Sequence, residues 1–389
     1  MTNGDSGSPA PAPRILLIAS APYHPWKGTC HRIRHNLEAI AALGYEADFL
    51  TLDAGELSAM ERVRVFRVPR AGCFSRLLLF LKAFALADRQ RYELIHGMGD
   101  CGVVAYWAGR FSGTPFVFEL HSDDVPQPMR SGRDAGDGIR RYSARRALAR
   151  ANAVIGNDMC VVSYLSGLNL HSRACLIPDI PAVEGDVAEP ARNLARIRFR
   201  TSPEQKIITC VGSYSRFQGL DIFFNAMPQV MSAVPAAKFV VVGGDADEIK
   251  RMRGKLEAAG IEEAVMFPGR MHTDEMAALL AISDVLVSPR RGGCAVPIKV
   301  LDYLCSGSPI VAVDTPANRA ILTPANALIT RPAPDSLADG IIRLCMEPAL
   351  GSGLAREGRA TLRREKRCAG EFKDALRVCY DYAAGNAKL

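Results

Sequence analysis

The sequence predicts an α/β protein made of two doubly wound domains, each a parallel sheet covered by helices. The chain has 389 residues, more than one ordinary core needs and enough for two domains of roughly 150 to 200 residues each. Short apolar, β-rich runs recur, and each is followed by a Gly, Ser or Pro turn and then by a segment of helical periodicity. This pattern stops after residue 178 and restarts at residue 206. Because ligands of such sheets bind beyond the carboxyl ends of the strands, we expect two facing domains with one deep cleft.

The predicted strands follow one another at the spacing of β-α units. In the first half they are RILLIAS (14–20), YEADFLT (45–51), RVRVFRV (62–68), ELIHG (93–97), FVFELH (116–121), AVIG (153–156) and ACLIP (174–178). In the second half they are KIITCVG (206–212), KFVVVGG (238–244), AVMFPG (264–269), DVLVS (284–288) and PIVAV (309–313).

Composition changes mark the domain boundaries. Residues 1–13, MTNGDSGSPAPAP, have neither the charged start nor the apolar stretch of a secretory leader, and we expect a disordered tail. Residues 179–193 are rich in Pro and acidic residues and are typical of a linker. We therefore assign residues 14–188 to an N-terminal domain, residues 189–365 to a C-terminal domain, and residues 366–389 to a helix that returns toward the N-terminal domain.

Composition also narrows the class of protein. Apolar residues make up 48% of the chain and charged residues 23%, and no run of 18 apolar residues occurs. The 11 cysteines are scattered without CxxC or metal-ligand spacing, so we expect reduced thiols in a cytoplasmic protein.

The formal net charge of +7 is concentrated in one segment. Seven arginines fall within 21 residues: Arg130, Arg133, Arg140, Arg141, Arg145, Arg146 and Arg150. The segment lacks the interleaved aromatic residues of a single-stranded nucleic-acid platform, so we expect no nucleic-acid partner. A solvated helix face and a contact with an anionic membrane through Arg140–Arg150 both fit. The nearby apolar stretch 73–90 fits a core helix, and it also fits the apolar part of such a membrane patch.

The stretch RRGGCAVPIKVLDYLCSGSPIVAVD, residues 290–314, predicts a short helix with unusual polar neighbours. Pro297 fits its first position and Gly307 its C-terminal cap. A stripe of apolar residues should be buried: Ile298, Leu301, Leu304 and Cys305.

Four backbone amides are then left at the positive end of this helix, where an anion such as phosphate binds readily. They belong to Gly293, Cys294, Ala295 and Val296. Lys299 can add a positive charge to that site, and Asp302 can accept hydrogen bonds from vicinal hydroxyls. An ordinary surface pair of Lys299 with Asp302 at i, i+3 is the alternative.

Two further glycine turns follow predicted strands. In CVGSYSRFQGLD, Gly212 and Ser213 end the strand, Arg216 supplies the cation of the turn, and Gly219 opens a helix. In the first half, Gly28 and Thr29 stand at the start of the helix that follows the first strand. Backbone amides at both turns can face a ligand.

His121 ends the strand FVFELH, so its imidazole should lie at the carboxyl end of a strand. It is either a satisfied structural histidine or a ligand contact. Asp123 and Asp124 follow it, but we find no metal-ligand constellation around them, no GxSxG elbow and no P-loop.

Several motifs together resemble the retaining, nucleotide-sugar-dependent glycosyltransferases of the GT-B fold, in their large fourth sequence family (group 1 glycosyl transferases). The resemblance covers most of residues 14–365 and is carried, in family order, by RIRHNLEAIAALGYEADFLT, FVFELH, VGSYSRFQGLDIFFNAM, VMFPGRMHTDEMAALLAISDVLVSP and PIKVLDYLCSGSPIVAVD. It implies two Rossmann-like domains, of which the N-terminal one binds the acceptor and the C-terminal one binds the nucleotide-sugar donor.

The resemblance also gives roles to individual residues. Asp302 stands where the family places the second Glu of its paired-glutamate motif, which holds the ribose hydroxyls. Lys299 resembles the Lys of a branch that writes PxKxxEY, and we assign it to the donor diphosphate. Gly28 is similar to the glycine whose amide approaches that diphosphate, and His121 to the histidine that contacts the donor sugar. Arg270 and Met271 resemble the segment whose backbone meets the base.

The chain departs from the family at three positions. Cys294 stands where the first Glu of the pair is expected, and a thiol cannot replace a carboxylate in holding hydroxyls. Ser213 and Gln218 stand where the family usually has Arg and Lys, although a branch with YQG also lacks that Lys.

The resemblance implies a metal-independent hexosyltransferase without a cofactor, whose donor is a nucleotide diphosphate sugar. The acceptor would be a hydroxyl of a polysaccharide, a lipid-linked glycan or a small molecule, and the enzyme would be cytoplasmic, in peripheral contact with the inner face of a membrane. Two alternatives remain: a sugar-nucleotide epimerase of the same fold, and a non-catalytic nucleotide-sugar-binding relative that lost turnover with the Glu at position 294. An NAD-dependent enzyme is disfavoured because no GxGxxG follows the first strand.

Overall fold

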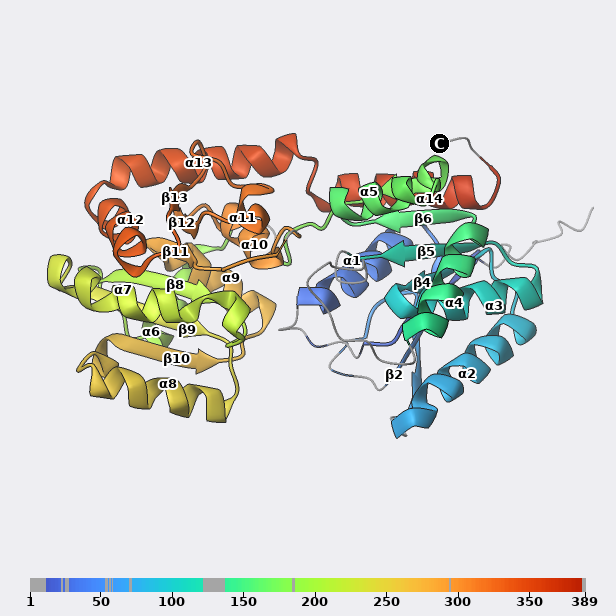
Figure 1. The fold of residues 1–389 in the computed structure, drawn as a ribbon, viewed down its shortest axis with the longest axis horizontal. Helices are drawn as coiled ribbons and strands as arrows, with labels where there is room; N and C mark the ends of the chain where they lie inside the picture. Colours follow the sequence, from blue (N-terminus) through green and yellow to red (C-terminus); the bar gives the residue numbers. More distant parts are fainter. Residues whose placement is uncertain are drawn as a thin grey trace, which may run out of the picture. The chain divides into compact units, whose positions relative to one another are not determined.

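The structure is a computed structural model that describes residues 12–21, 24, 28–52, 55, 57, 59–69, 72–121, 137–183, 186–293 and 295–386. They form two compact units (Figure 1). The first unit includes Thr29–Pro178 together with Ala369–Leu389, and the second includes Asp179–Cys368. Each unit is an α/β sandwich around a parallel sheet and is described by itself.

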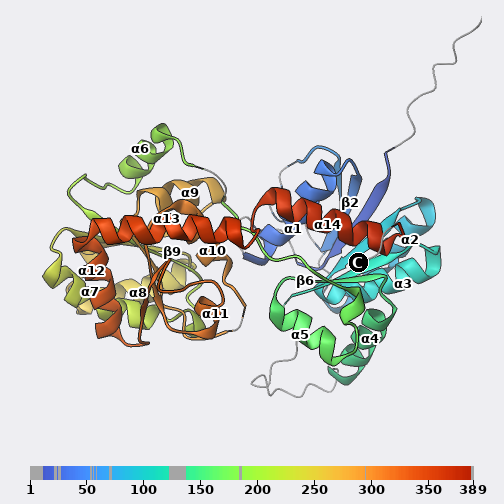
Figure 2. The same ribbon diagram turned by 90° about the horizontal axis from the view of Figure 1, so that it is seen from above.

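The first unit contains a seven-stranded parallel sheet in the order β3-β2-β1-β4-β5-β6-β7. The strands are β1 (Arg14–Ala19), β2 (Glu46–Leu52), β3 (Val63–Val68), β4 (Leu94–Met98), β5 (Phe116–Leu120), β6 (Ala153–Gly156) and β7 (Ala174–Leu176). The α-helices are α1 (Gly28–Ala42), α2 (Ser75–Arg89), α3 (Gly102–Ser112), α4 (Asp137–Arg150), α5 (Met159–Gly167) and α14 (Ala369–Ala383). Short 3-10 helices are η1 (Gly72–Phe74), η2 (Gly99–Cys101) and η3 (His171–Arg173). Helices α1 and α14 lie on one face of the sheet, and α2, α3 and α4 pack on the other (Figure 2).

The second unit contains a six-stranded parallel sheet in the order β10-β9-β8-β11-β12-β13. Its strands are β8 (Lys206–Val211), β9 (Ala237–Val242), β10 (Val265–Gly269), β11 (Val285–Ser288), β12 (Ile310–Val313) and β13 (Leu328–Thr330). Its α-helices are α6 (Glu189–Arg198), α7 (Leu220–Ala233), α8 (Ala246–Ala258), α9 (Thr273–Ile282), α10 (Ile298–Ser306), α11 (Pro316–Arg319), α12 (Pro334–Met346) and α13 (Pro348–Arg364). Its 3-10 helices are η4 (Arg216–Gln218) and η5 (Glu262–Ala264).

All twelve predicted strands are confirmed, with ends that differ by at most two residues. One strand was missed: β13, whose three residues are too few to show a period. The linker prediction for residues 179–193 is wrong in its second half, because helix α6 begins at Glu189 with Pro190 in its first turn. The helix predicted within residues 73–90 is confirmed as α2.

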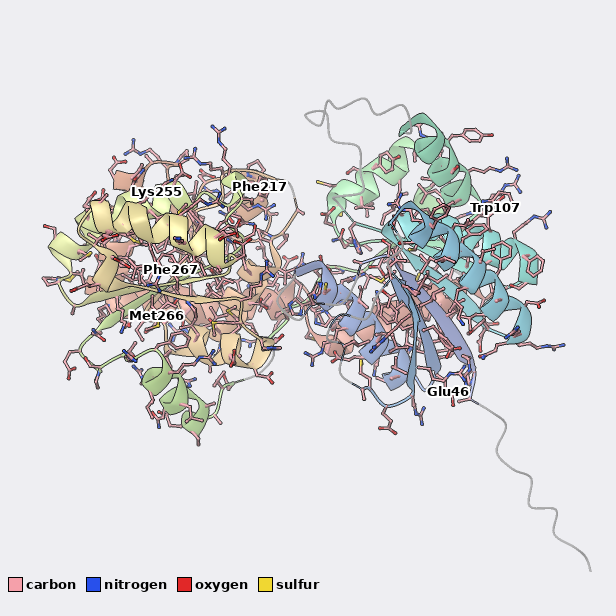
Figure 3. All side chains as sticks on the ribbon, turned by 90° about the horizontal axis from the view of Figure 1, so that it is seen from below. Glu46, Trp107, Phe217, Lys255, Met266 and Phe267 are labelled. Atoms are coloured by element: carbon pink, nitrogen blue, oxygen red, sulfur yellow. The ribbon has the colours of Figure 1, made fainter. Side chains whose placement is uncertain are left out.

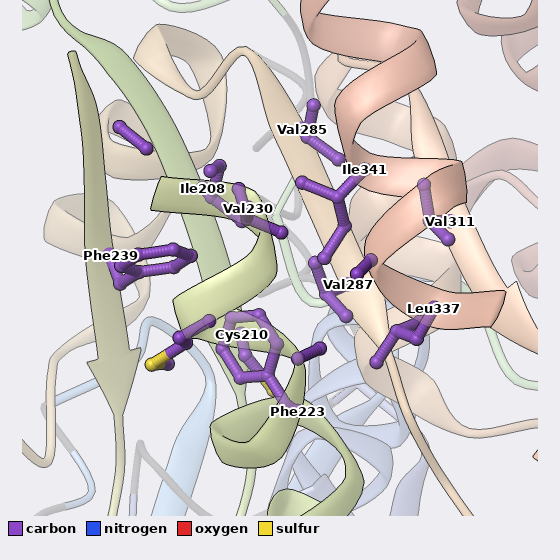
Figure 4. Packing of buried hydrophobic residues seen from close by; sticks show 14 of the residues in the cluster. Ile208, Cys210, Phe223, Val230, Phe239, Val285, Val287, Val311, Leu337 and Ile341 are labelled. Atoms are coloured by element: carbon purple, nitrogen blue, oxygen red, sulfur yellow. The ribbon is translucent and has the colours of Figure 1, made fainter. Parts of the chain in front are cut away.

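Side chains alternate between the two faces of the second sheet and fill a core on each. Met266 and Phe267 are neighbours on β10, and they pack in different apolar clusters (Figure 3). On one face, Phe223 of α7 and Ile341 of α12 meet the valines of β11 and β12 (Figure 4). Strands buried on both faces are continuously apolar, which is why the sequence predicted them well.

In the second sheet the strand order reverses between β8 and β11, and the loops after these two strands touch. The amide of Arg291 donates to the carbonyl oxygen of Phe217 at 3.1 Å. Gly219 permits this contact: its φ is 69°, and a Cβ there would lie 1.9 Å from the carbonyl oxygen of Pro289. A glycine is therefore required at position 219 by both the dihedral angle and the space.

We expect Gly219→Ala to lower the free energy of unfolding by about 1–3 kcal/mol or more, because the added methyl group must displace backbone in a left-handed residue. Gly254→Ala is the matched control, since position 254 lies in α8 with nothing within 4 Å of a new Cβ, and alanine should stabilise it by about 1 kcal/mol. Urea unfolding of both variants measures the difference. Equal stabilities would contradict this account of the turn.

Candidate functional site

The strand-order reversal of the second sheet gathers the loops that follow β8 and β11. Ligands of open parallel sheets bind at such a reversal, beyond the carboxyl ends of the strands. The loop after β8 runs from Gly212 to Gly219, and the loop after β11 runs from Pro289 toward α10. The sequence prediction had assigned anion binding to both loops, and the structure brings them together.

Lys299, from the first turn of α10, extends to the end of β8. Its Nζ donates to the carbonyl oxygen of Val211 at 2.8 Å and to Oε1 of Gln218 at 2.9 Å. Among the described residues its third hydrogen has no acceptor, so a ligand oxygen can take it. Desolvation lowers the pKa of Lys299; the thiol of Cys210 opposes this effect and the charge of Arg290 adds to it. Gln218 stands where the family that this chain resembles usually has a lysine, and here it accepts a hydrogen bond from Lys299.

Arg290 is a second cation at this place, and the sequence prediction missed it. Its guanidinium carbon lies 4.2 Å from the ring centroid of Phe217, and its Nε donates to the carbonyl oxygen of Gly292 at 2.7 Å. Gly293, with φ of 106°, leaves room for it, because a Cβ there would lie 2.5 Å from Nη2 of Arg290. The available signal was an arginine directly after a buried strand and ahead of two glycines.

The other arginines near these loops are more exposed. Arg216, predicted as the cation of its turn, is exposed in η4, with no ion pair to any described residue. Arg291 is paired with Asp221. Lys299 and Arg290 are therefore the cations held in place at the strand-order reversal.

Several amides here have no hydrogen-bond partner within the described part of the chain: those of Ser213, Gly293, Ala295 and Val296. Cys294 lies outside the described residues. The structure corrects the predicted helix start, because Pro297 has φ −71° and ψ 128° and is the N-cap, not the first helical residue. The amides therefore precede the helix by two residues or more, and the helix dipole supports an anion there only weakly. Gly307 is confirmed as the left-handed C-terminal cap.

The predicted buried stripe of α10 is only partly right. Leu301 and Leu304 are buried as expected, whereas Ile298 and Cys305 are half-buried. Tyr303 is fully buried in the core, and its hydroxyl accepts from the amide of Val211 at 2.8 Å.

Asp302 faces a different part of the second unit. Its Oδ1 accepts from the amides of Ala182 and Val183 at 2.7 and 3.2 Å, so it fastens the segment that leads into this unit. Burial raises the pKa of Asp302 to about 7, because these two amides offset the desolvation only in part. Asp302 and Lys299 form no ion pair with each other, so the alternative of a surface pair is wrong.

Arg270 and Met271 follow β10 at the same edge of the sheet. The side chain of Arg270 is exposed, whereas that of Met271 is 2% exposed and packs in the core. Only the backbone of Met271 is thus available to a ligand.

In the first unit, His121 directly follows β5 and is half-buried. Its Nε2 lies 2.7 Å from Oε1 of Glu119, a fully buried carboxylate that also accepts from Nε of Arg32 at 2.8 Å and from Nδ2 of Asn36 at 2.9 Å. Burial alone would raise the pKa of Glu119, but the charge of Arg32 and the hydrogen bonds of His121 and His96 hold it well below 4.5. The sequence prediction named His121 but missed Glu119, although a charged residue inside a buried strand was a signal.

The remaining predicted positions are Gly28 and Thr29, together with Asp123 and Asp124. Helix α1 begins at Gly28, with Thr29 next in its first turn. Asp123 and Asp124 lie outside the described residues. Within the described ranges, no group of three or more His, Cys, Asp or Glu could hold a metal ion, and nine of the cysteines there form no disulfide bond.

The structure is thus an α/β protein of two parallel-sheet units, with two cations held at the strand-order reversal of the second sheet. Residues 27–179 match the family described as glycosyl transferase 4-like domain, and residues 205–347 match glycosyl transferases group 1. The chain is 28% identical to phosphatidyl-myo-inositol mannosyltransferase of Mycobacterium leprae (strain TN) over 367 residues, 90% of this chain and 92% of that protein.

Solved structures share the fold. Sucrose-phosphate synthase from Thermosynechococcus elongatus superposes with a TM-score of 0.75 at 21% identity, covering 96% of this chain and 100% of that one. Anabaena HepE in complex with UDP-glucose gives 0.73 at 17% identity, covering 94% and 98%. The chain therefore belongs to the glycosyltransferases of the GT-B fold, which confirms the predicted fold class and the prediction of a glycosyltransferase.

Asp302 should give the second unit a distinctive pH dependence. Its pKa is about 7 in the fold against an ordinary 3.8, so the folded state binds the extra proton between these values. The free energy of unfolding therefore falls as pH rises from about 4 to about 7. We expect Asp302→Asn, which keeps an acceptor for the two amides, to remove this fall and to gain up to about 4 kcal/mol on the parent at pH 7.

Urea unfolding of both proteins at several pH values measures the difference. Asp314→Asn is the control: Arg319 lowers the pKa of Asp314, so its removal should not stabilise the protein at neutral pH. A constant difference between Asp302→Asn and the parent over this range would contradict the shifted carboxyl.

Proposed function

We propose that the protein transfers a hexosyl group from a nucleotide diphosphate sugar to an acceptor hydroxyl, with retention of the anomeric configuration and without a metal ion. The observation that carries this proposal is the pair of cations, Lys299 and Arg290, beside unpaired amides at the strand-order reversal. A diphosphate needs such a concentration of donors, and a neutral ligand would not.

The chemistry follows from the leaving group. As the bond between the sugar carbon and the phosphate oxygen breaks, negative charge grows on the diphosphate and the sugar gains oxocarbenium character. Lys299, Arg290 and the amides of Ser213, Gly293 and Ala295 stabilise that charge in place. The acceptor oxygen forms the new bond on the same face, and its proton passes to the departing phosphate oxygen. We favour this route over a covalent intermediate because it requires no carboxylate nucleophile.

Other roles are proposed on the resemblance. The amides at Gly28, Thr29 and Val296 bind the diphosphate, and Arg216 reaches it from solvent. Gly212 lines the same place without donating, because its amide is bonded to the carbonyl oxygen of Val242 at 3.0 Å. The backbone at Arg270 and Met271 contacts the base. His121 binds a hydroxyl of the donor. Asp302, whose Oδ1 already accepts from the amides of Ala182 and Val183, offers its Oδ2 to a second hydroxyl.

A mannosyl group is the first candidate, because the Mycobacterium leprae relative is by name a mannosyltransferase whose acceptor is phosphatidyl-myo-inositol. A glycolipid or a glycan is the corresponding acceptor class. The two other functions considered, epimerisation and binding without turnover, make different predictions about the donor: only transfer consumes it in proportion to an acceptor.

The test is a panel of GDP- and UDP-linked hexoses, scored first for binding by thermal shift and then for nucleoside diphosphate release with and without inositol phospholipid. Transfer predicts acceptor-dependent release that persists in EDTA and a product with the anomeric configuration of the donor. Release that needs no acceptor, or a change of the sugar nucleotide itself, would overturn the proposal.

For the active donor, we expect Lys299→Ala to lower kcat about 10²–10³-fold, because it removes one donor aimed at developing charge. Lys255→Ala is the matched control, since Lys255 lies on α8, away from the loops after β8 and β11 (Figure 3). It should leave kcat unchanged. Wild-type turnover by Lys299→Ala would remove the central role proposed for this lysine.

We also propose that the first unit contacts an anionic membrane. Its α2, α3 and α4 pack side by side, and their outer side chains combine large apolar residues with cations. The exposed apolar residues of this α2–α4 surface are Phe74, Leu77, Leu78, Leu81, Trp107, Phe111 and Tyr142. Arg145, Arg146 and Arg150 are exposed on α4, whereas the side chains of Arg140 and Arg141 lie outside the described part.

Helix α2 is a core helix, because it buries Leu79 and Leu86. Its Leu77 and Leu81 face outward, 53% and 55% exposed, which supports the proposed membrane contact. Exposed leucines beside arginines suit the boundary between lipid headgroups and acyl chains. Of the described helices, none is long and apolar enough to cross a bilayer.

We expect Arg145→Gln with Arg146→Gln to weaken binding to phosphatidylglycerol-containing vesicles about tenfold or more, since each arginine near such a surface contributes about 1 kcal/mol. Leu77→Gln with Leu81→Gln should weaken it as well. The control, Leu194→Gln with Ile197→Gln, removes an exposed apolar pair of α6 in the second unit and should have no effect. Co-sedimentation measures all three, and unchanged binding by both test variants would reject the surface.

A further inference from the structure

Glu119 is a buried carboxylate that the chemistry above does not use. It stands in the middle of the first sheet on β5, with both its oxygens in contact with donors from other elements. Arg32 and Asn36 approach from α1, and Nε2 of His96, on β4, lies 2.9 Å from Oε2, off the line of a straight hydrogen bond. His121 approaches from the end of β5 itself.

The C-terminal helix α14 completes this Glu119 network. The hydroxyl of Tyr380 lies 2.8 Å from Nδ1 of His96, and Phe372 lies under the guanidinium of Arg32 at 4.6 Å. The charge of Glu119 also acts on Cys379 of the same helix. The groups that face Glu119 thus come from α1, β4, the end of β5 and α14.

The ionised state of Glu119 sets the direction of its contacts with both histidines. A carboxylate only accepts, so Nε2 of His121 donates to it; Nε2 of His96 lies 2.9 Å away without an aligned hydrogen bond, and it also carries a hydrogen because two lone pairs at that distance would repel. Nδ1 of a neutral His96 then accepts from Tyr380, and Nδ1 of a neutral His121 is an acceptor as well. The contacts that link Tyr380, His96, Glu119 and His121 are all consistent with this placement of the hydrogens.

Exposure singles out His121 among the described partners of Glu119. Its side chain is 19% exposed, compared with 2% for Arg32 and 0% for His96. A carboxylate that served only to neutralise Arg32 would not need a partner that reaches the surface at the carboxyl end of a strand, where ligands bind.

We propose that Glu119 is a positioning residue of the transferase: it fixes the imidazole of His121 with Nε2–H turned inward, so that Nδ1 is the acceptor for a hydroxyl of the donor sugar, and Tyr380 supports this arrangement through His96. This inference rests on the proposed function for the identity of the ligand. The tautomer and its dependence on Glu119 do not rest on it.

The first experiment measures the tautomer without any activity. In protein labelled with ¹⁵N-histidine, long-range ¹H–¹⁵N spectra distinguish the two neutral tautomers, and His121→Asn identifies the signals of His121 by their loss. We expect the Nε2–H tautomer in the wild type and a mixture in Glu119→Gln, whose amide can donate as well as accept. A wild-type His121 with its hydrogen on Nδ1 would overturn the proposal.

The second experiment measures transfer. We expect Glu119→Gln to lower kcat about 100-fold with a smaller change in KM, because the imidazole is displaced from the reacting sugar. Because this change leaves the charge of Arg32 buried without a counter-charge, the protein can fail to fold, and a milder variant is needed. Tyr380→Phe removes only the hydroxyl that bonds to His96 and should lower kcat about threefold to tenfold.

Tyr45→Phe is the matched control, because Tyr45 packs edge-on against Tyr380 with ring centroids 6.5 Å apart, and no hydrogen bond joins its hydroxyl to the Glu119 network. It should keep wild-type kcat. Wild-type kcat in Tyr380→Phe and in folded Glu119→Gln would refute the positioning role. If the wild type consumes no nucleotide sugar at all, the proposed function fails, and the tautomer measurement still decides whether Glu119 orients His121.

Discussion

The contact between the loops after β8 and β11 is the constraint on which the second unit's site depends. Gly219 lets one loop come within hydrogen-bond distance of the other, and Arg291 and Phe217 close the contact. Beside this contact, Lys299 reaches the end of β8, and its ammonium group donates to the carbonyl oxygen of Val211, the last residue of that strand. A glycine in the sequence thereby decides where positive charge is held. The chemistry of the site follows from that geometry.

The cations of this site differ from most arginines and lysines of the protein. Arg291, Arg319 and Arg343 are exposed and paired with carboxylates, and such pairs contribute little energy. Lys299 is bound by neutral acceptors instead, and Arg290 stacks on an aromatic ring. Burial is the main cause of the lowered pKa of Lys299, and the charge of Arg290 lowers it further. These cations are held in place by contacts within the protein, so their arrangement does not depend on a ligand.

The sequence predicted what local patterns encode. Apolar runs and glycine turns located the strands and, through the carboxyl-end rule, the loops of Lys299 and His121. It could not predict partners distant along the chain: Arg32 and Glu119 are 87 positions apart, and Asp302 meets amides about 120 positions earlier. Nor did it predict that Pro297 precedes the helix, because proline suits both the N-cap and the first turn. The partners of Glu119 and Asp302 and the start of α10 all depend on where these residues lie in the fold, which residue type alone does not specify.

Glu119 and Asp302 show how far partners decide the state of a buried carboxyl. Desolvation favours the neutral form of both. Glu119 has a guanidinium beside it, and the full opposite charge outweighs desolvation, so the group stays ionised and can only accept hydrogen bonds. Asp302 has only the amides of Ala182 and Val183 beside it, and their partial charges offset less of the desolvation than a full charge would. Its pKa of about 7 leaves it partly protonated at neutral pH. The protonated form of Asp302 can donate as well as accept, whereas the ionised Glu119 only accepts and therefore holds the hydrogen of a histidine on the nitrogen that faces it.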